Sequence, residues 1–380
     1  DQLVQAVQAG MREAHEALKA SFASSGGTKE RRIGRGADAQ IETAVDADRL
    51  RELNEQLIAA PDGFTVDPKL AGQLARRREH LGEEGGIDWA QAEGLAFATL
   101  LTEATPVRLT GQDTERGTFS HRHLVLHDYQ TGAKHVPIEH LPDARAPFKV
   151  YNSPLSEMAA LGFEYGYSVS CPRALVLWEA QFGDFVNSAQ VIVDQFIVSG
   201  LSKWGQSSRL TLLLPHGYEG NGPEHSSARL ERFMQLAAQE NIRIVNCSTA
   251  AQYFHVLRRQ ALHPKARPLV LLTPKGLLRL KQAASQLHQL TRGSFRQIID
   301  DPALDEDAKR EVDRLVLCSG KVYYDIVGHE AYKDVEGVAV ARLEQLYPFP
   351  VAAYDELLSR YPTINEVVWA QEEPQNMGAW

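Results

Sequence analysis

Short apolar segments alternate with helix-like segments through the middle of the chain, and this alternation constrains the fold more than any other feature. The apolar segments read as strands because each is a brief run of mostly aliphatic residues. They span residues 107–109, 174–178, 210–214, 242–246 and 269–272. Apolar residues recur at helical spacing over residues 156–165, 185–199, 228–240 and 249–260. Such alternation is typical of a mostly parallel sheet with helices on both faces, so the sequence predicts an α/β fold.

The remaining sequence divides around this alternating region. Before it, the pattern predicts helices at residues 1–23, near 50–57 and from Pro68 onward, and Asp88 is expected to cap a helix over 89–102. After it, a charged and polar stretch precedes a second α/β unit, with strands at 315–319, 338–343 and 366–370 and helices at 321–332 and 351–361. We therefore expect a helical linker region at 1–86, an α/β domain at 87–280, a connecting segment at 281–312 and a smaller α/β domain at 313–380.

The composition argues against several classes of protein. The 380 residues carry a formal net charge of −9, whereas a general nucleic-acid binder would present a basic field. Cys171, Cys247 and Cys318 show no CxxC spacing, which indicates neither a zinc site nor a disulfide framework and fits a reducing compartment. No apolar run approaches the length of a membrane span, and no GxGxxG follows a strand. Because the chain starts at Asp1 rather than Met, we expect it to be a fragment of a longer protein.

A polar, glycine-rich loop follows the strand expected at residues 210–214. It contains His216 and His225 within the string PHGYEGNGPEHSSARLERF, and histidine can exchange protons near neutral pH. Open α/β folds place ligands at the carboxyl ends of their strands, so this loop is a candidate site. The string is also compatible with a solvated surface loop whose serines, including Ser226, cap the next helix.

Two further segments carry candidate side chains, and both also have a purely structural interpretation. Glu157 lies in the first turn of an expected helix, where the helix dipole favours a carboxylate without any function. Phe182 and Phe185 lie three residues apart, as in an ordinary core. The polar residues beside them, Gln181 and Glu179, could line a pocket or satisfy the backbone of a turn.

The string GQDTERGTFSHRH adds another group of polar candidates. Gln112 and Asp113 are candidate pocket residues, and Arg116 and Arg122 follow them. Arginine suits the recognition of carboxylates or phosphates because its donors form a rigid fork. Salt-bridged scaffolding is equally compatible with the pattern, and the sequence leaves this choice open.

Five strings of this chain together resemble the thiamin-diphosphate-dependent first components of 2-oxoglutarate dehydrogenase complexes. They are GQDTERGTFSHRH, NSPLSEMAALGFEYG, LWEAQFGDFVNSAQVIVDQF, PHGYEGNGPEHSSARLERF and QEEPQNMGAW. The resemblance runs from about Ile87 to the last residue, and the relatives that act on 2-oxoadipate share nearly all of these strings. It implies a transketolase-like fold, with a pyrimidine-binding domain at 87–280 followed by a smaller α/β domain.

The resemblance also implies a cofactor, thiamin diphosphate, and roles for the residues near it. Glu157 would hydrogen-bond the aminopyrimidine ring and promote its activation, while Phe185, or secondarily Phe182, would stack on that ring. Three polar residues would line the same cofactor pocket, namely Gln181, Gln112 and Asp113. The family binds the diphosphate through Mg²⁺ with a GDG motif and a later Asn. This chain has no GDG, so the metal ligands are expected in a preceding domain and none is expected here.

For the substrate, the resemblance implies an active-site role for the histidine of the EHSS string. His225 would work as an acid or base, or towards an oxyanion, and His216 and Ser226 are weaker candidates in the same loop. The implied activity is the oxidative decarboxylation of 2-oxoglutarate, a step of the tricarboxylic acid cycle, with transfer of the succinyl group to a lipoyl carrier. Two alternatives stay open, namely the same chemistry on 2-oxoadipate and a non-catalytic dimerisation or docking module.

The implied partners follow from the same resemblance. We expect a homodimer that works with the lipoyl-bearing succinyltransferase and the dihydrolipoamide dehydrogenase of the complex, with no nucleic acid and no membrane. A bacterial cytoplasm is favoured over a mitochondrial matrix. The fragment alone is expected to bind the cofactor weakly and to show no turnover.

Overall fold

The computed structural model describes residues 2–24, 41–220 and 222–380. The chain divides into two units at the junction of Asp38 and Ala39. The first unit contains α1 (Gln2–Ser24), which confirms the helix expected at residues 1–23. Residues 25–40 of the expected linker region lie outside the described residues.

Aspartate residues start the next three helices, which are α2 (Ala47–Ile58), α3 (Pro68–Glu79) and α4 (Trp89–Thr102). The carboxylates of Asp46, Asp67 and Asp88 each accept a hydrogen bond from a backbone N–H of the first turn. The cap expected at Asp88 is therefore confirmed, and α4 has the bounds that the sequence predicts. Nearly every residue of α4 is buried, which agrees with its apolar composition.

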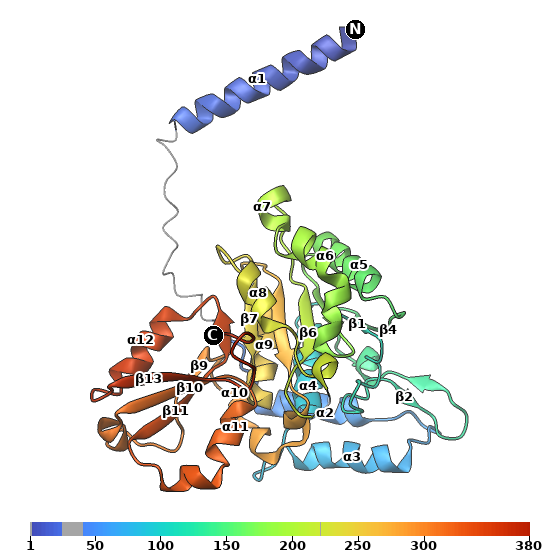
Figure 1. Cartoon of the computed structure of the whole chain (residues 1–380). Coiled ribbons are helices and arrows are strands. Elements are labelled where there is room, and N and C mark those ends of the chain that lie inside the picture. The colour runs from blue at the N-terminus through green and yellow to red at the C-terminus, as the bar shows by residue number, and fades with distance from the viewer. Residues whose placement is uncertain (1, 25–40, 221) are drawn as a thin grey trace. The chain divides into compact units, whose positions relative to one another are not determined.

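Seven strands form the large sheet, in the order β12-β7-β8-β6-β5-β1-β4 (Figure 1). They are β1 (Val107–Gly111), β4 (Phe148–Asn152), β5 (Leu175–Glu179), β6 (Thr211–Pro215), β7 (Arg243–Asn246), β8 (Leu269–Thr273) and β12 (Gln345–Tyr347). All neighbouring strands are parallel except β12 and β7. The mostly parallel sheet confirms the predicted α/β fold class.

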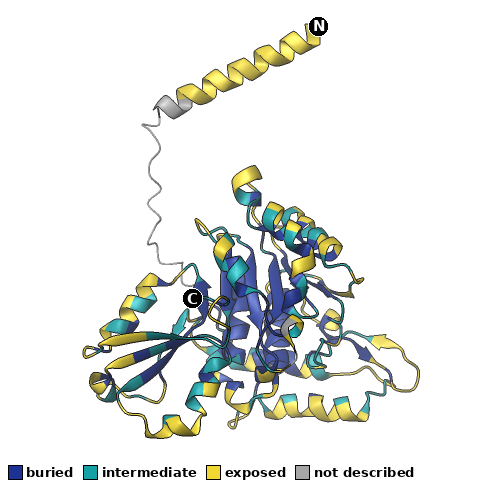
Figure 2. Cartoon of the chain, in the orientation of Figure 1, coloured by how far each residue is buried: buried dark blue, intermediate teal, exposed yellow. Residues whose placement is uncertain are grey.

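Helices cover both faces of the large sheet. On one face, Leu109, Leu177 and Leu271 belong to the same core as α4 and α9 (Ala250–Leu262). On the other face, Val176, Leu212 and Val270 belong to a second core with α5 (Glu157–Ser170) and α8 (Leu230–Leu236). Because successive side chains of a strand point to opposite faces, two buried faces require continuously apolar strands. Figure 2 shows these strands as a deeply buried layer.

Two helices beside the large sheet differ markedly from the sequence prediction. The helix expected at residues 185–199 is an irregular series, with a 3₁₀ segment at Gly183–Ala189, α6 (Gln190–Ile192), a π segment at Val193–Ile197 and α7 (Gly200–Trp204). The helix expected at 228–240 is too long, since α8 begins only at Leu230. Arg229 has a φ of 59°, a left-handed conformation that an α-helix cannot include. No side chain caps α8, so the interpretation of Ser226 as its cap is wrong.

Four strands form the small sheet, in the order β13-β10-β11-β9. They are β9 (Ile298–Ile299), β10 (Arg314–Cys318), β11 (Val338–Leu343) and β13 (Glu366–Ala370), and only β9 runs antiparallel to its neighbour. Two helices accompany them, α11 (Val322–Val327) and α12 (Val351–Ser359). The helix expected at 321–332 is therefore too long, and its end is a separate 3₁₀ segment at Glu330–Asp334.

Several short elements were not predicted. Beyond the predicted strands, the large sheet contains β4 and β12, and the small sheet contains β9. In addition, β2 (Leu126–His127) pairs with β3 (Lys134–His135) in a separate two-stranded ribbon. Helix α10 (His288–Thr291) lies in the expected connecting segment. Strand β12 follows β11 directly in the sequence but pairs with β7, so the chain passes from the small sheet into the large one.

Candidate active site at the carboxyl edge of the large sheet

Four parallel strands of the large sheet end at one edge. The pairing places the last residues Gly111 and Glu179 opposite each other, and likewise Pro215 and Thr273. The loops that leave these strands carry most of the residues singled out in the sequence. The carboxyl edge is where parallel sheets bind ligands, so these loops form the candidate site.

Glu157 is the first residue of α5, as the sequence predicts. Its half-buried carboxylate accepts two hydrogen bonds from other segments. Nε2 of Gln112 lies 2.8 Å from Oε1, and Oγ of Ser188 lies 2.9 Å from Oε2. Gln112 and Glu157, which were each expected at the cofactor pocket, thus contact each other. Ser188 was missed, because a serine within a helix-like stretch carries no sign of its distant partner.

His225 lies among the phenylalanine residues proposed for the cofactor pocket. Its ring stacks on Phe182, with the centroids 4.0 Å apart and the planes at 14°. The ring of Phe185 lies edge-on to His225, at 5.9 Å and 86°. The ring of Phe119 contacts the ring of Phe182, and their centroids are 5.8 Å apart. The four rings form an aromatic cluster that fixes the plane of the imidazole.

Gly183 allows the two loops of the aromatic cluster to approach each other. A Cβ atom at this position would lie 2.5 Å from both the Cβ of Ala228 and the backbone oxygen of Pro215. Only glycine fits such a contact without displacing backbone. The next residue, Asp184, forms an ion pair with Arg229, so a charge contact joins the same two segments.

The backbone of the histidine loop (residues 215–227) is held by several hydrogen bonds. Nζ of Lys275 donates to the backbone oxygen of His225 at 2.8 Å, and Oγ of Ser226 donates to the backbone oxygen of Gly222 at 2.6 Å. The N–H of Gly217 donates to the oxygen of Ser226 at 2.9 Å and closes the neck of the loop. Nδ1 of His225 is buried and makes no hydrogen bond to any described residue.

The second loop histidine, His216, is buried and engages both of its ring nitrogens. Nδ1 accepts the N–H of Ala228 at 3.0 Å, and Nε2 lies 2.9 Å from Oε1 of Glu373. Because Nδ1 accepts a backbone hydrogen, the ring proton is on Nε2 and donates to the carboxylate. The structure therefore places His216 in the support of the loop.

The remaining polar candidates pair with one another. Nε2 of Gln181 donates to Oδ2 of Asp113 at 2.9 Å, and Nη2 of Arg116 lies 3.2 Å from the same oxygen. Gln112 and Asp113 are adjacent, so one turn after β1 contacts both Glu157 and Gln181. Oε1 of Gln181 is buried and has no hydrogen-bond partner among the described residues.

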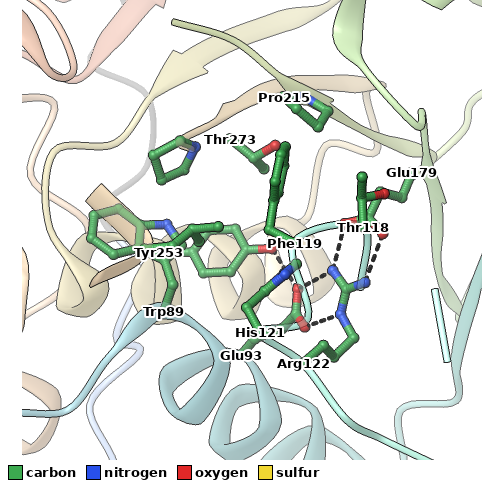
Figure 3. Close-up of a pocket in the computed structure, with 12 residues that line it drawn as sticks. Trp89, Glu93, Thr118, Phe119, His121, Arg122, Glu179, Pro215, Tyr253 and Thr273 are labelled. Atoms are coloured by element: carbon green, nitrogen blue, oxygen red, sulfur yellow. Dashed lines mark hydrogen bonds and ion pairs between the residues drawn. The ribbon is translucent and has the colours of Figure 1, made fainter. Parts of the chain in front are cut away.

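Arg122 lies in a buried ion cluster with Glu93 and Glu179, as Figure 3 shows. Its guanidinium donates to Glu93 at 2.5 Å and to Glu179 at 2.6 Å, and the hydroxyl of Tyr253 donates to Glu93 at 2.6 Å. Burial alone would lower the pKa of Arg122, but the two carboxylates hold it well above its usual value. Arg122 and Glu179 are thus engaged with each other in a buried ion cluster, as the scaffolding interpretation predicts.

A small cavity lies beside this ion cluster, and Phe119 of the aromatic cluster also lines it (Figure 3). Three polar atoms on its lining make no hydrogen bond to any described residue, namely Nε1 of Trp89, Nδ1 of His121 and Oγ1 of Thr273. Burial and the nearby guanidinium of Arg122 lower the pKa of His121 well below its usual value, so its ring is neutral at pH 7. Buried polar atoms without partners are unfavourable, and the space suits roughly one water molecule.

Two negative findings concern the described part of the chain. It contains no group of three or more His, Cys, Asp or Glu side chains that could hold a metal ion. None of its helices combines the length and the apolar character that crossing a membrane requires.

Comparison with known families decides the classification. Residues 85–281, more than half of the chain, match the transketolase pyrimidine-binding domain. The chain belongs to this family. Residues 284–380 match the 2-oxoglutarate dehydrogenase C-terminal domain. The resemblance and the transketolase-like fold predicted from the sequence are therefore confirmed.

Individual relatives agree with this classification. The chain is 54% identical over 346 residues to the 2-oxoglutarate dehydrogenase E1 component of Geobacillus sp. (strain WCH70). It is 53% identical over 345 residues to the protein of the same name from Bacillus subtilis (strain 168). Each match covers 90% of this chain, and the chain spans 36% of the length of each relative.

Proposed function

We propose that this chain is part of a 2-oxoglutarate dehydrogenase E1 component and forms the half of its active site that receives the aminopyrimidine ring of thiamin diphosphate. The whole protein would decarboxylate 2-oxoglutarate oxidatively and transfer the succinyl group to a lipoyl carrier. One observation carries this proposal: Gln112 and Ser188 both donate hydrogen bonds to Glu157, and Ser188 also donates to the backbone of Phe185 in the aromatic cluster. The names of the relatives support the choice of substrate.

The residues at the site fit an aminopyrimidine ring. Such a ring has flat faces and a nitrogen-bearing edge, which a carboxylate and an amide can hydrogen-bond. Glu157 offers the carboxylate, and the buried Oε1 of Gln181 offers an acceptor without a partner among the described residues. Phe185 is the better stacking residue, because His225 already covers one face of Phe182. We propose that Gln112 and Asp113 complete the lining of this pocket.

The diphosphate and Mg²⁺ require a different set of residues. Mg²⁺ prefers carboxylate, carbonyl and water oxygens, and the described residues hold no acidic cluster suited to a metal. We propose that these ligands lie in the part of the longer relatives that this chain does not match. The chain spans 36% of the length of the relative from Geobacillus, so most of that relative lies outside the matched region.

Glu157 would be the acid–base residue of this half-site. When bound, thiamin diphosphate supplies the nucleophilic carbon and the electron sink that the decarboxylation needs. Glu157 would hold a proton at the edge of the aminopyrimidine ring, and Gln112 and Ser188 would keep its two oxygens in place. A positioned acid or base of this kind contributes about 10²–10⁴ in rate.

His225 would act on the substrate. Its plane is fixed by the aromatic cluster, and an imidazole ring can donate a hydrogen bond to a substrate oxygen or accept one from a substrate hydroxyl group. The ring nitrogens of His216 and the hydroxyl of Ser226 are already engaged. We therefore propose that these two residues serve the substrate site by shaping the loop.

A homodimer is the proposed assembly of the whole protein, and one exposed surface supports it. Apolar side chains gather on α5, α7 and the irregular helix between them, and we call this set the α5–α7 surface. Its members are Met158, Phe163, Val191, Phe196 and Trp204. Phe196 packs against Trp204 with their centroids 5.6 Å apart, and both line a groove with Gly162 and Gly166. Exposed apolar surface of this kind is typical of an interface.

Further parts of the proposal concern organisation and partners. We infer a helical linker region at residues 1–86, the pyrimidine-binding domain at 87–280, a connection at 281–312 and the C-terminal domain at 313–380, although β12 of the last segment joins the large sheet. The other components of the complex, a lipoyl-bearing succinyltransferase and a dihydrolipoamide dehydrogenase, would be the protein partners. The bacterial relatives support a bacterial cytoplasm.

The test uses the full-length enzyme with thiamin diphosphate, Mg²⁺ and the other two components of the complex. We expect NADH formation with 2-oxoglutarate, and a kcat/KM that exceeds the value for 2-oxoadipate by roughly 10–200-fold, the range that one methylene provides. A preference for 2-oxoadipate would contradict the proposed substrate. Absence of turnover with both acids would contradict the enzyme and favour a docking module.

A further inference from the structure

The C-terminal segment, residues 371–378, returns to the large sheet after β13 and contacts the histidine loop (Figure 1). Gln371 organises this segment internally. Its Oε1 accepts from Nε1 of Trp369 at 2.8 Å, and its Nε2 donates to the backbone oxygen of Met377 at 2.8 Å. The segment is therefore a folded turn that presents Glu372 and Glu373 to the loop.

The strongest contact of this segment is the pair of Glu373 and His216. Their side chains are only 8% and 3% exposed, and the two interacting atoms are 2.9 Å apart. Burial opposes ionisation of Glu373, yet the hydrogen bond from His216 holds the pKa of Glu373 below its usual value. A charged acceptor at Nε2 keeps the ring proton there, which leaves Nδ1 free to accept the N–H of Ala228.

Ala228 lies three residues after His225 and directly follows the histidine loop. Glu373, His216 and the backbone of Ala228 thus form a linear series of hydrogen bonds. Loss of the carboxylate would free the ring to rotate or to exchange its proton between the nitrogens. Either change removes the acceptor of the Ala228 N–H and loosens the chain next to His225.

A second set of contacts joins the same two segments. Oε2 of Glu372 accepts the N–H of Tyr218 at 3.0 Å, and the hydroxyl of Tyr218 lies 3.3 Å from the sulfur of Met377. The N–H of Gly378 donates to Glu231 of α8 at 3.2 Å. The start of the histidine loop and the helix α8 that follows the loop are therefore both attached to the C-terminal segment.

We infer that Glu373 is a positioning residue, which acts through His216 and the backbone of Ala228 to hold His225 at the substrate. This inference rests on the proposed function, because it assigns the C-terminal segment a role in the same active site. Glu373 does not touch the reacting atoms in this scheme. It fixes the geometry of the histidine loop, in which the N–H of Gly217 also donates a hydrogen bond to the backbone oxygen of Ser226.

The test compares three variants of the full-length enzyme. Glu373→Ala removes the acceptor of His216, Glu373→Gln keeps an oxygen acceptor, and Asn376→Ala is a control at an exposed residue of the same segment. We expect Glu373→Ala to lower kcat on 2-oxoglutarate by about 10–100-fold, the scale of a misplaced catalytic group, with unchanged affinity for thiamin diphosphate. Glu373→Gln should recover most of the loss, and Asn376→Ala should match the wild type.

A second measurement does not depend on turnover. Amide hydrogen exchange in peptides that contain Tyr218 and Ala228 should be faster in Glu373→Ala than in Glu373→Gln, while α4 exchanges as in the wild type. Normal kcat with unchanged exchange in Glu373→Ala would overturn the inference, as would a loss of kcat without any rescue by Glu373→Gln. If the wild type does not turn over 2-oxoglutarate, the proposed function fails, and the exchange at Ala228 still decides whether Glu373 holds the loop.

Discussion

The carboxylate of Glu157 accepts hydrogen bonds from two segments that lie far from it in the sequence. Gln112 and Ser188 each hold one oxygen, so the carboxylate has little freedom to rotate about its last bond. Acid–base groups work best when neighbouring residues fix their position in this way. His225 is fixed differently, by stacking on Phe182 and by the hydrogen bond from Lys275 to its backbone.

Replacing Glu157 with Gln should lower the turnover of the full-length enzyme by about 100-fold or more, because the variant loses its acid–base group. Proton–deuterium exchange at the thiazolium carbon of the cofactor should slow with it. The circular dichroism spectrum should not change, since Gln retains the size of the side chain. The control is Glu84→Gln, at an exposed carboxylate before α4, which should behave as the wild type. Near-normal exchange in Glu157→Gln would show that another group activates the cofactor.

His225→Ala should give a different result. Turnover of the 2-oxoacid should fall, while the affinity for thiamin diphosphate and the proton exchange of the cofactor stay near the wild-type values. The reason is that His225 lies in the loop after β6, whereas Glu157 is the first residue of α5. Kinetics and calorimetry on the same preparation check this prediction, and weak cofactor binding by His225→Ala would contradict it.

Arg122→Met should destabilise the protein by about 3–5 kcal/mol, because Glu93 and Glu179 would remain buried without their cation. Urea unfolding measures this loss. Arg116→Met is the matched control from the same segment, since Arg116 pairs with Asp113 at the surface and such pairs contribute about 0–1 kcal/mol. Similar losses in both variants would mean that the buried cluster contributes little.

At the scale of elements, the ribbon of β2 and β3 shows how one carboxylate can order a peripheral loop. Oδ2 of Asp128 accepts the N–H of Thr65 at 2.6 Å, which ties the ribbon to the connection between α2 and α3. Oδ1 accepts the N–H groups of Thr131 at 2.7 Å and Gln130 at 2.9 Å. These backbone donors, with that of Thr65 first, lower the pKa of Asp128 to about 2.

This shift predicts a pH dependence. A carboxyl group with a lowered folded-state pKa stabilises the fold above its usual pKa of 3.8, and this contribution disappears as the pH falls toward about 2. Asp128→Asn should therefore be less stable than the wild type at neutral pH, and the difference in the urea midpoint should shrink as the pH falls below about 4. A difference that stays constant over this range would contradict the role of the charge.

The elements also show what the sequence could reveal and what it could not. Continuous apolar strands and aspartate caps gave correct positions for α4, β11 and β13, because local residues determine them. Strand β4 was missed since it lies at an edge and alternates buried Phe148 with exposed Lys149. The irregular helix after β5 begins at Gly183, which packs closely against Ala228, a partner that no local pattern reveals. Glu157 and His225 were singled out from the sequence because they lie in strings that resemble a known family. Ser188 and Glu373 were not, because their importance comes from hydrogen bonds to residues far away in the sequence.

At the scale of the whole molecule, the α5–α7 surface is the proposed dimer interface. Phe163 is 61% exposed and Trp204 is 52% exposed, although both are large aromatic residues. Stable interfaces between proteins bury about 1,200–2,000 Å² in total around such residues. A second copy of the whole protein, related by a twofold axis, is the proposed occupant.

Trp204→Glu should shift the full-length enzyme from dimer toward monomer, because a charge would be buried without a partner at the centre of the interface. Sedimentation velocity over a range of concentrations measures the shift. Tyr129→Glu provides the control, since Tyr129 is also an exposed aromatic residue, at 66% exposure, and lies between β2 and β3, outside the α5–α7 surface. Equal sedimentation of Trp204→Glu and the wild type would place the dimer interface elsewhere.

Strand β12 makes the C-terminal region a structural part of the large sheet. It pairs with β7 and covers what would otherwise be an open edge, with unpaired N–H and C=O groups that invite pairing with other chains. A chain cut after β9 would lose this cover and tend to aggregate, even though every residue of the half-site up to Lys275 would still be present. Swapping the C-terminal regions of two relatives would also replace the strand that borders β7. Chimaeras meant to exchange regulation or partner choice should therefore keep β12 with the large sheet that it completes.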